Sequence, residues 1–170
     1  VVYKNSWTAL HLAAENGHSG VLKLLLNAEA DVNVQNKEGW TPLHQAAENG
    51  RRDSVQVLLD TKADINVRNK QGWTALHSAA QLGRTSVMRM LVDVETDVNV
   101  QNMNGWTALH LAARNGHYRA VKMLFNAKAD VNVQNKNGWT ALHLAAETGH
   151  SYIIRMLLIV AKGIKYVSQT

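Results

Sequence analysis

Histidine is the residue type whose number and spacing could support metal chemistry in this chain of 170 residues. Five of the eight histidines recur every 33 residues: His11, His44, His77, His110 and His143. Zinc takes nitrogen ligands about 2.0–2.1 Å from one ion. Stacked helical units lie about 8–10 Å apart, so successive members of the series cannot share an ion. We therefore predict a structural role for them and no bound metal. The other three, His18, His117 and His150, follow glycines and are interpreted as ordinary surface-loop residues.

The sequence lacks the arrangements of residues on which enzymes depend. It contains no cysteine, which removes thiolate nucleophiles, thiolate ligands and disulfides. Nine of its eleven glycines occupy two positions that recur every 33 residues, so they punctuate the backbone rather than form a phosphate-binding loop. No nucleophile motif is present, and a catalytic site needs several groups that converge on one pocket. We predict no enzymatic activity and no cofactor.

The histidines belong to a larger repeated unit, which must position them. Trp-Thr-Ala-Leu-His, or Trp-Thr-Pro-Leu-His once, begins at residues 7, 40, 73, 106 and 139. Its threonine is suited to cap a helix, Pro42 suits the first helical position, and a glycine about nine residues later favours a left-handed helix end. A leucine-rich second helix follows, as in residues 21–26. The polar stretch 31–39 then predicts a short hairpin of two extended arms.

These units must stack on one another to be stable. Neither helix reaches the length of about 12–15 residues that isolated helices need, so each unit must bury its apolar face against its neighbours. Paired alanines such as Ala13-Ala14 allow close approach. We predict an all-α repeat fold, an elongated and curved solenoid that forms a single array over residues 1–170. Its approximate repeats are 3–35, 36–68, 69–101, 102–134 and 135–167.

The 33-residue period and the segment Thr41-Pro42-Leu43-His44 resemble ankyrin repeats over nearly the whole chain. The other four units have alanine in place of the proline. The resemblance implies an ankyrin-type solenoid of helix-turn-helix units with β-hairpin loops. It also implies an intracellular module, cytoplasmic or nuclear, that binds other proteins. The repeated histidine is then expected to hydrogen-bond to its threonine and to adjacent backbone.

The sequence departs from the family pattern in two respects. The glycine that usually ends the second helix is replaced by Glu29, Lys62, Glu95, Lys128 and Lys162. A side chain in a left-handed position costs about 1 kcal/mol, unless the helix ends in another conformation. In addition, neither terminal unit has the polar outer face that solenoid ends normally carry. This predicts either a fragment of a longer array or end-to-end self-association.

Tryptophan is the first candidate for partner binding. All five tryptophans recur in register: Trp7, Trp40, Trp73, Trp106 and Trp139. The resemblance places this position on the concave face near the hairpins, and tryptophan is enriched among interface hot spots. Packing of each indole on the neighbouring hairpin would serve stability instead, and the two roles are compatible.

The end of the first helix varies between units, as a tailored binding surface would. The candidates there are Glu48, Gln81, Leu82, Arg114 and Asn115. Leu82 is apolar where the other units are polar, which suggests a contact core at the centre of the groove. The hairpin tips carry a row of lysines that either meets an acidic peptide or forms a solvated basic edge: Lys4, Lys37, Lys70 and Lys136.

The predicted function is a non-catalytic scaffold that holds an extended or helical segment of another protein. Eighteen basic and thirteen acidic residues give a net charge of +5, a mild bias toward acidic partners. No apolar run approaches the about 20 residues of a membrane helix, and no export signal is evident. The alternatives are an engineered ankyrin-type binder, a structural spacer of a larger protein and, on charge alone, nucleic-acid binding.

Four asparagines are candidates for modification on resemblance alone. Each ends a Leu-x5-Asp-(Val/Ile)-Asn pattern similar to one recognised by asparaginyl hydroxylases: Asn33, Asn66, Asn99 and Asn132. In an animal cell they would be candidate hydroxylation sites. A second interpretation is that they stabilise the hairpin turn.

Overall fold

The computed structural model describes residues 6–93 and 96–161, and in this part of the chain the regular structure is helical. The helices form five pairs: α1 (Ala9–Asn16) with α2 (Ser19–Asn27), α3 (Pro42–Glu48) with α4 (Arg52–Asp60), α5 (Ala75–Gln81) with α6 (Thr85–Val92), α7 (Ala108–Arg114) with α8 (Tyr118–Asn126), and α9 (Ala141–Glu147) with α10 (Ser151–Ala161). We number the pairs as units one to five and call the first helix of each pair inner and the second outer.

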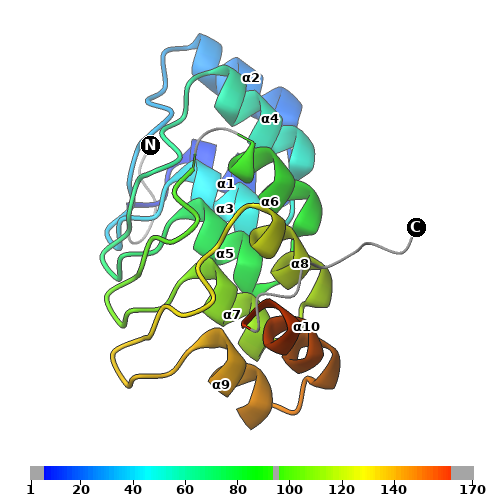
Figure 1. The fold of residues 1–170 in the computed structure, drawn as a ribbon. Helices are drawn as coiled ribbons and strands as arrows, with labels where there is room; N and C mark the ends of the chain where they lie inside the picture. The colour runs from blue at the N-terminus through cyan, green and yellow to red at the C-terminus, as the bar shows by residue number, and fades with distance from the viewer. Residues whose placement is uncertain (1–5, 94–95, 162–170) are drawn as a thin grey trace, which may run out of the picture.

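The units stack in chain order. Inner helices pack on inner helices and outer helices on outer helices, so that the chain forms two helical layers. The loops between units project together on the side away from the outer helices (Figure 1). This arrangement confirms the predicted all-α repeat fold.

Each inner helix begins as the repeated threonine predicts. The Thr41 hydroxyl accepts a hydrogen bond from the His44 backbone N–H at 3.4 Å. In return, Nδ1 of His44 accepts the Thr41 N–H at 3.2 Å. The same reciprocal cap is present at the start of all five inner helices, so two N–H groups that the helix leaves unpaired are satisfied at each start.

Three outer helices are followed by a left-handed residue although the glycine of the family is missing there, so the alternative of a different helix end does not apply to them. Glu29, Lys62 and Lys128 have positive φ angles of 61°, 63° and 63°, in the left-handed region that glycine occupies most readily. The equivalent Glu95 and Lys162 lie outside the described residues. The inner helices, in contrast, are followed by glycines that take up this conformation, such as Gly50 with a φ of 66°.

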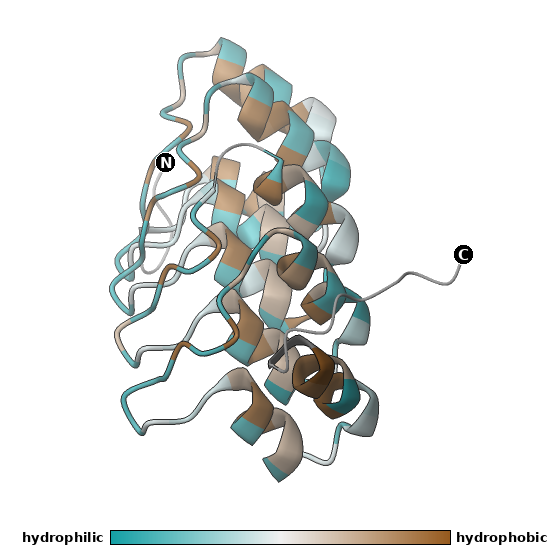
Figure 2. Ribbon diagram, in the orientation of Figure 1, coloured by the Kyte–Doolittle hydropathy of each residue, from teal (hydrophilic) through white to brown (hydrophobic). Residues whose placement is uncertain are grey.

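The core is continuous from unit to unit. Ala46 and Ala47 are fully buried between inner helices, as are their equivalents in the next two units. Leu58, Val87 and Leu124 are buried between the two layers. Figure 2 shows hydrophilic residues on the sides of the outer helices that face away from this core. Each unit therefore depends on its neighbours for burial, as short helices require.

The loops differ from the predicted pairs of extended arms. The reversal in unit two is closed by one backbone hydrogen bond, from the Asn36 N–H to the Trp40 carbonyl at 3.0 Å, and by a tight turn at Gly39. No strand forms in the residues that the structure describes. Instead the tips bond to one another, since the Lys70 N–H donates to the Glu38 carbonyl of the preceding tip at 2.9 Å. The stack holds the loops, which therefore need few bonds of their own.

Candidate protein-binding groove

The repeated histidines link each unit to the next. Nε2 of His44 donates to the Trp73 carbonyl at 2.9 Å, and its Nδ1 lies 2.8 Å from the Thr41 hydroxyl. A carbonyl oxygen can only accept, so Nε2 carries the proton, and the ring is neutral because Nδ1 accepts the Thr41 N–H. The same link joins three further histidines to the next unit: His11 to Trp40 (2.8 Å), His77 to Trp106 (3.0 Å) and His110 to Trp139 (3.0 Å).

Burial favours the neutral form of these histidines. It lowers the pKa of His44 and His77 from 6.5 to about 4, although their bonds to backbone carbonyls act in the opposite direction. Burial also lowers the pKa of His11 and His110. Among residues 6–93 and 96–161, no three metal-ligating side chains are grouped as a metal site requires. The expected structural role, threonine and backbone bonding, is confirmed.

The tryptophans pack within the loop stack and remain half-buried. The Trp40 ring lies 5.3 Å from the ring of His44 and 6.3 Å from that of Trp73, with edge-to-face geometry in both pairs. Such pairs stabilise beyond the area they bury. The guanidinium of Arg114 lies over the Trp106 ring, 5.3 Å from its centre, which is within the range of a cation–π interaction. The indoles therefore support stacking and still present a surface.

A buried asparagine holds four of the tryptophans, Trp40, Trp73, Trp106 and Trp139, in place, and the sequence interpretation missed it. In unit three, Oδ1 of Asn69 accepts the backbone N–H groups of Gln71 and Trp73, both at 2.9 Å. The recurrence of this asparagine every 33 residues was the available signal. Its equivalents make the same two bonds: Asn36, Asn102 and Asn135.

A second ladder joins the ends of the inner helices, and it corrects the interpretation of two histidines. His117 and His150 are not ordinary surface-loop residues, because each bonds to the preceding unit. Nε2 of His117 donates to the Gln81 carbonyl at 2.9 Å, and Nε2 of His150 donates to the Arg114 carbonyl at 3.0 Å. The carbonyls at a helix end have no partner within the helix. Arginine fills this role in units two and three: Arg51 bonds to the Glu15 carbonyl and Arg84 to the Glu48 carbonyl.

A groove of about 870 Å³ lies between the loop tips of units three to five and the inner helices α5 and α7. Its lining consists of Gln71, Trp73, Gln81, Asn102, Met103, Asn104, Trp106, Leu111, Arg114, Asn115, Lys136 and Asn137. Six of the predicted partner-binding residues are among them: Trp73, Gln81, Trp106, Arg114, Asn115 and, from the row of lysines, Lys136. Seven lie outside it: Trp7, Trp40, Trp139, Lys37, Lys70, Glu48 and Leu82. Lys4 lies outside the described residues.

The apolar part of the groove differs from the prediction. Leu82, expected at its centre, caps the C-terminal end of α5, is 41% exposed and is not among the residues that line the groove. Leu111 lies in the groove in its place. The sequence interpretation missed Leu111, although the signal was present: the residue after the repeated histidine is Gln45 in unit two and Ser78 in unit three.

Charge is distributed unevenly along the inner surface. Arg114 and Lys136 line the groove, and no carboxylate is among its lining residues. Toward unit one, Glu48 is half-buried at the end of α3. Burial, together with the charge of Glu15, raises its pKa, while Arg84 lowers it. The ends of the inner helices thus carry Glu15 and Glu48 in units one and two, whereas the groove carries Arg114 of unit four and Lys136 of unit five.

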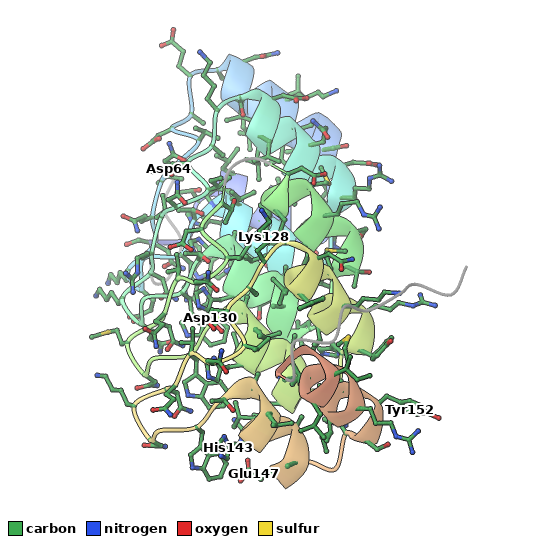
Figure 3. The ribbon with its side chains drawn as sticks, viewed as in Figure 1. Asp64, Lys128, Asp130, His143, Glu147 and Tyr152 are labelled. Carbon is green, nitrogen blue, oxygen red and sulfur yellow. The ribbon has the colours of Figure 1, made fainter. Side chains whose placement is uncertain are left out.

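The candidate hydroxylation sites have different surroundings. The side-chain oxygens of Asn33 and Asn99 accept the backbone N–H groups of Asp64 and Asp130 in the next unit, both at 2.8 Å (the two aspartates are labelled in Figure 3). The local turn is held by the aspartate two residues earlier, as Asp31 does for Asn33. Asn33 and Asn99 therefore link units rather than stabilise their own turns. The remaining two, Asn66 and Asn132, are exposed.

The stacked helix pairs, joined through threonine, histidine and a tryptophan carbonyl, define a helical solenoid. The family model of ankyrin repeats (3 copies) matches residues 1–69, 61–135 and 95–170. The chain belongs to the ankyrin-repeat family, whose members generally act as protein–protein interaction modules and typically have no enzymatic activity. No curated protein matches the chain. In the described part of the chain, no helix is long and apolar enough to span a bilayer.

Proposed function

We propose that the chain is a non-catalytic scaffold that holds an extended segment of another protein in the groove of units three to five. The observation that carries this proposal is the convergence of Trp73, Trp106, Leu111 and Arg114 on one groove of about 870 Å³. Tryptophan and arginine are the residues most enriched among interface hot spots.

The indoles supply most of the contact area at small entropic cost. Both are already held by packing against histidine rings, as Trp73 is against His77 at 6.0 Å and Trp106 against His110 at 6.1 Å. A side chain that is ordered before binding loses little rotamer freedom on association. The amides that line the groove are suited to bond the backbone of an extended segment, and Gln81 and Asn115 vary between units. Specificity therefore comes from the helix ends.

The positive charge of the groove favours a bound segment that carries acidic side chains. With Arg114 and Lys136 in the groove and no carboxylate lining it, an acidic side chain of the partner is favoured there. Glu48, Lys37 and Lys70 lie outside the groove and would act as flanking contacts. They affect the rate and direction of docking more than the affinity, as rim charges generally do.

A pair of matched surface variants tests this proposal. Met103→Glu with Arg114→Glu changes the groove at two exposed residues, whereas Tyr152→Glu with Arg155→Glu makes similar changes on α10. Circular dichroism first confirms that both variants fold. Affinity capture from a cell lysate, followed by titration of the captured protein, then compares them with the wild type. We expect the groove variant alone to lose the partner. Equal capture by both variants, or none by the wild type, contradicts the proposal.

End-to-end self-association is a second candidate function, and one observation favours it. Val21 and Leu24 of unit one are 45% and 71% exposed, while the equivalent Val87 in unit three is fully buried. Covering such residues with a second copy is favourable by about 25 cal/mol per Å² of apolar area. Sedimentation over a range of concentrations tests this. A dimer that dissociates on Leu24→Glu supports it, and a monomer at every concentration contradicts it.

A further inference from the structure

The outer helices carry a second surface with a shape of its own. Two adjoining hollows, of about 800 Å³ and 460 Å³, lie over α4, α6 and α8. Both are lined by Thr85, Arg89 and Asp93, so they form one continuous depression. These helices lie on the side of the molecule opposite to the loops (Figure 1). The depression is therefore separate from the groove of the proposed function, and the two can be occupied together.

Positive charge dominates this depression. Four cations line it, and we call them the outer cationic face: Arg52, Arg89, Arg119 and Lys122. Asp93 is the single carboxylate among the lining residues. Like charges on neighbouring helices repel one another, and a solvated helix surface gains nothing from collecting them. Relief of this repulsion by an anionic ligand favours binding.

These cations are not used by the fold. Within residues 6–93 and 96–161, none of the four takes part in a hydrogen bond or an ion pair, and all four are exposed. Other arginines of the chain are engaged: Arg84 bonds to the Glu48 carbonyl at 3.0 Å and Arg68 to the Gln101 carbonyl at 2.6 Å. The guanidinium groups of Arg89 and Arg119 are thus free to bind a ligand.

The depression also contains apolar groups. Val92, Met123 and Ala127 line the larger hollow and are half-buried. Its volume of about 800 Å³ can receive side chains, and methionine adapts readily to the shape of what it contacts. The surface therefore fits a ligand in which apolar side chains alternate with anionic groups.

We propose that the outer cationic face binds an acidic segment of a second protein, with its carboxylates on Arg89 and Arg119 and an apolar side chain against Met123. The planar fork of arginine pairs with a carboxylate through two parallel hydrogen bonds. A single-stranded nucleic acid fits less well, because such ligands stack their bases on aromatic side chains, and none lines the two hollows. A flat bilayer does not reach half-buried groups within a depression.

Fluorescence anisotropy with the complete chain tests this binding directly. The probe is a fluorescein-labelled peptide that alternates pairs of glutamates with single leucines, and the control peptide has glutamine in place of glutamate. Arg89→Glu with Arg119→Glu is compared with Lys23→Glu and Arg155→Glu. The second pair makes the same change in net charge on exposed residues of α2 and α10 outside the depression. Circular dichroism checks that both fold.

We expect the Arg89 and Arg119 variant to bind the acidic peptide at least about tenfold more weakly than the wild type. The matched control should change affinity by less than about twofold. The glutamine peptide should bind at least about tenfold more weakly than the acidic one. Arg114 and Lys136 of the groove also favour carboxylates, so the groove variant, Met103→Glu with Arg114→Glu, should lose some affinity for the acidic peptide but clearly less than the Arg89 and Arg119 variant does. The order of these two losses separates this proposal from the proposed function.

Four results would overturn the inference. The first is an equal loss in both charge-reversed variants, which would mean that net charge alone attracts the peptide. The second is a loss confined to the groove variant. The third is tighter binding of a single-stranded oligonucleotide, or of phosphatidylserine vesicles, than of the acidic peptide. Retention of full affinity by the Arg89 and Arg119 variant would have the same consequence.

Discussion

Units three and five share the motif Trp-Thr-Ala-Leu-His, at residues 73–77 and 139–143, but place it in very different surroundings. His77 is 1% exposed and bonds to the Trp106 carbonyl of the next unit. His143 is exposed and bonds to Thr140 of its own unit. Figure 3 shows His143 and Glu147 at the end of the stack. A shared motif therefore defines the local cap, while the neighbouring unit determines how much the motif contributes to stability.

The first unit supports the same conclusion from the opposite end. Val21 and Val87 are the same residue type at equivalent positions, yet one is 45% exposed and the other fully buried. Burial of a valine side chain stabilises a protein by about 1.5–3 kcal/mol. The interior units are thus expected to be the most stable part of the chain, with opening that begins at the ends.

The largest expected effect is a loss of stability in acid, which should be concentrated in the interior units. The pKa of His44 and of His77 is lowered from 6.5 to about 4 in the folded chain. Between these values the unfolded chain takes up protons that the folded chain does not. Stability is therefore complete above pH 6.5 and falls as the pH decreases toward about 4, by about 3 kcal/mol for each histidine.

Urea unfolding from pH 7.5 to pH 4.5 measures this effect. The control is His77→Gln, which removes one of the two titrating groups. Its free energy of unfolding should change less steeply with pH than that of the wild type. An equally steep change in both proteins would assign the acid sensitivity to other groups.

The next largest effect is the loss of stability when His77 or His143 is replaced by alanine. His77→Ala removes a buried ring and leaves the Trp106 carbonyl and the Thr74 N–H without their partner. We expect a loss of about 2–4 kcal/mol. His143→Ala removes an exposed cap and should cost less than about 1 kcal/mol. Urea denaturation of the two variants checks this, and similar losses would show that the link between units adds little.

Alanine substitutions at two loop-tip glycines distinguish the cost of backbone strain from the cost of disturbing the contact between neighbouring tips. Gly105 and Gly138 have φ angles of 77° and 76°, so an alanine is equally strained at either position. A Cβ at Gly105 would lie 2.9 Å from the backbone nitrogen of Lys136 in the next tip. A Cβ at Gly138 would meet no described atom within 4 Å.

We therefore expect Gly105→Ala to cost about 2–3 kcal/mol and Gly138→Ala about 1 kcal/mol. Thermal and urea unfolding of the two variants give both values. Their difference measures the close approach of the tips, and equal costs would mean that the next tip moves aside freely.

The local features of the fold were predictable because they depend on residues near one another in the sequence. The cap between Thr41 and His44 spans three positions, and the strain at Lys62 arises because a side chain occupies the left-handed position where the family has glycine. Both predictions are confirmed. The family pattern also gave the correct role of the repeated histidine.

Features that join different units were harder to predict. The bond from His117 to the Gln81 carbonyl spans 36 residues, and no local pattern marks it. The groove brings Leu111 rather than Leu82 beside the tryptophans, because helical phase and stacking together determine which side chains face it. The same reason explains why the tips bond to each other, as Met103 does to Gln71 at 2.9 Å, and form no strands of their own.

The smallest expected effect tests whether neighbours alone distinguish interior from terminal units. Glu29 ends α2 in unit one and Lys62 ends α4 in unit two, both exposed and with nearly equal φ angles of 61° and 63°. Replacement by glycine removes the strain of a left-handed side chain but adds backbone entropy to the unfolded chain.

We expect Glu29→Gly and Lys62→Gly each to stabilise their own unit by about 0.5–1 kcal/mol, as measured by hydrogen exchange of the amides of α2 and α4. Because neither side chain is buried against a neighbouring unit, the two gains should be equal. A clearly larger gain at Lys62 would mean that strain at the outer helix ends is shared between units. The difference between interior and terminal units would then reside in the backbone as well as in burial.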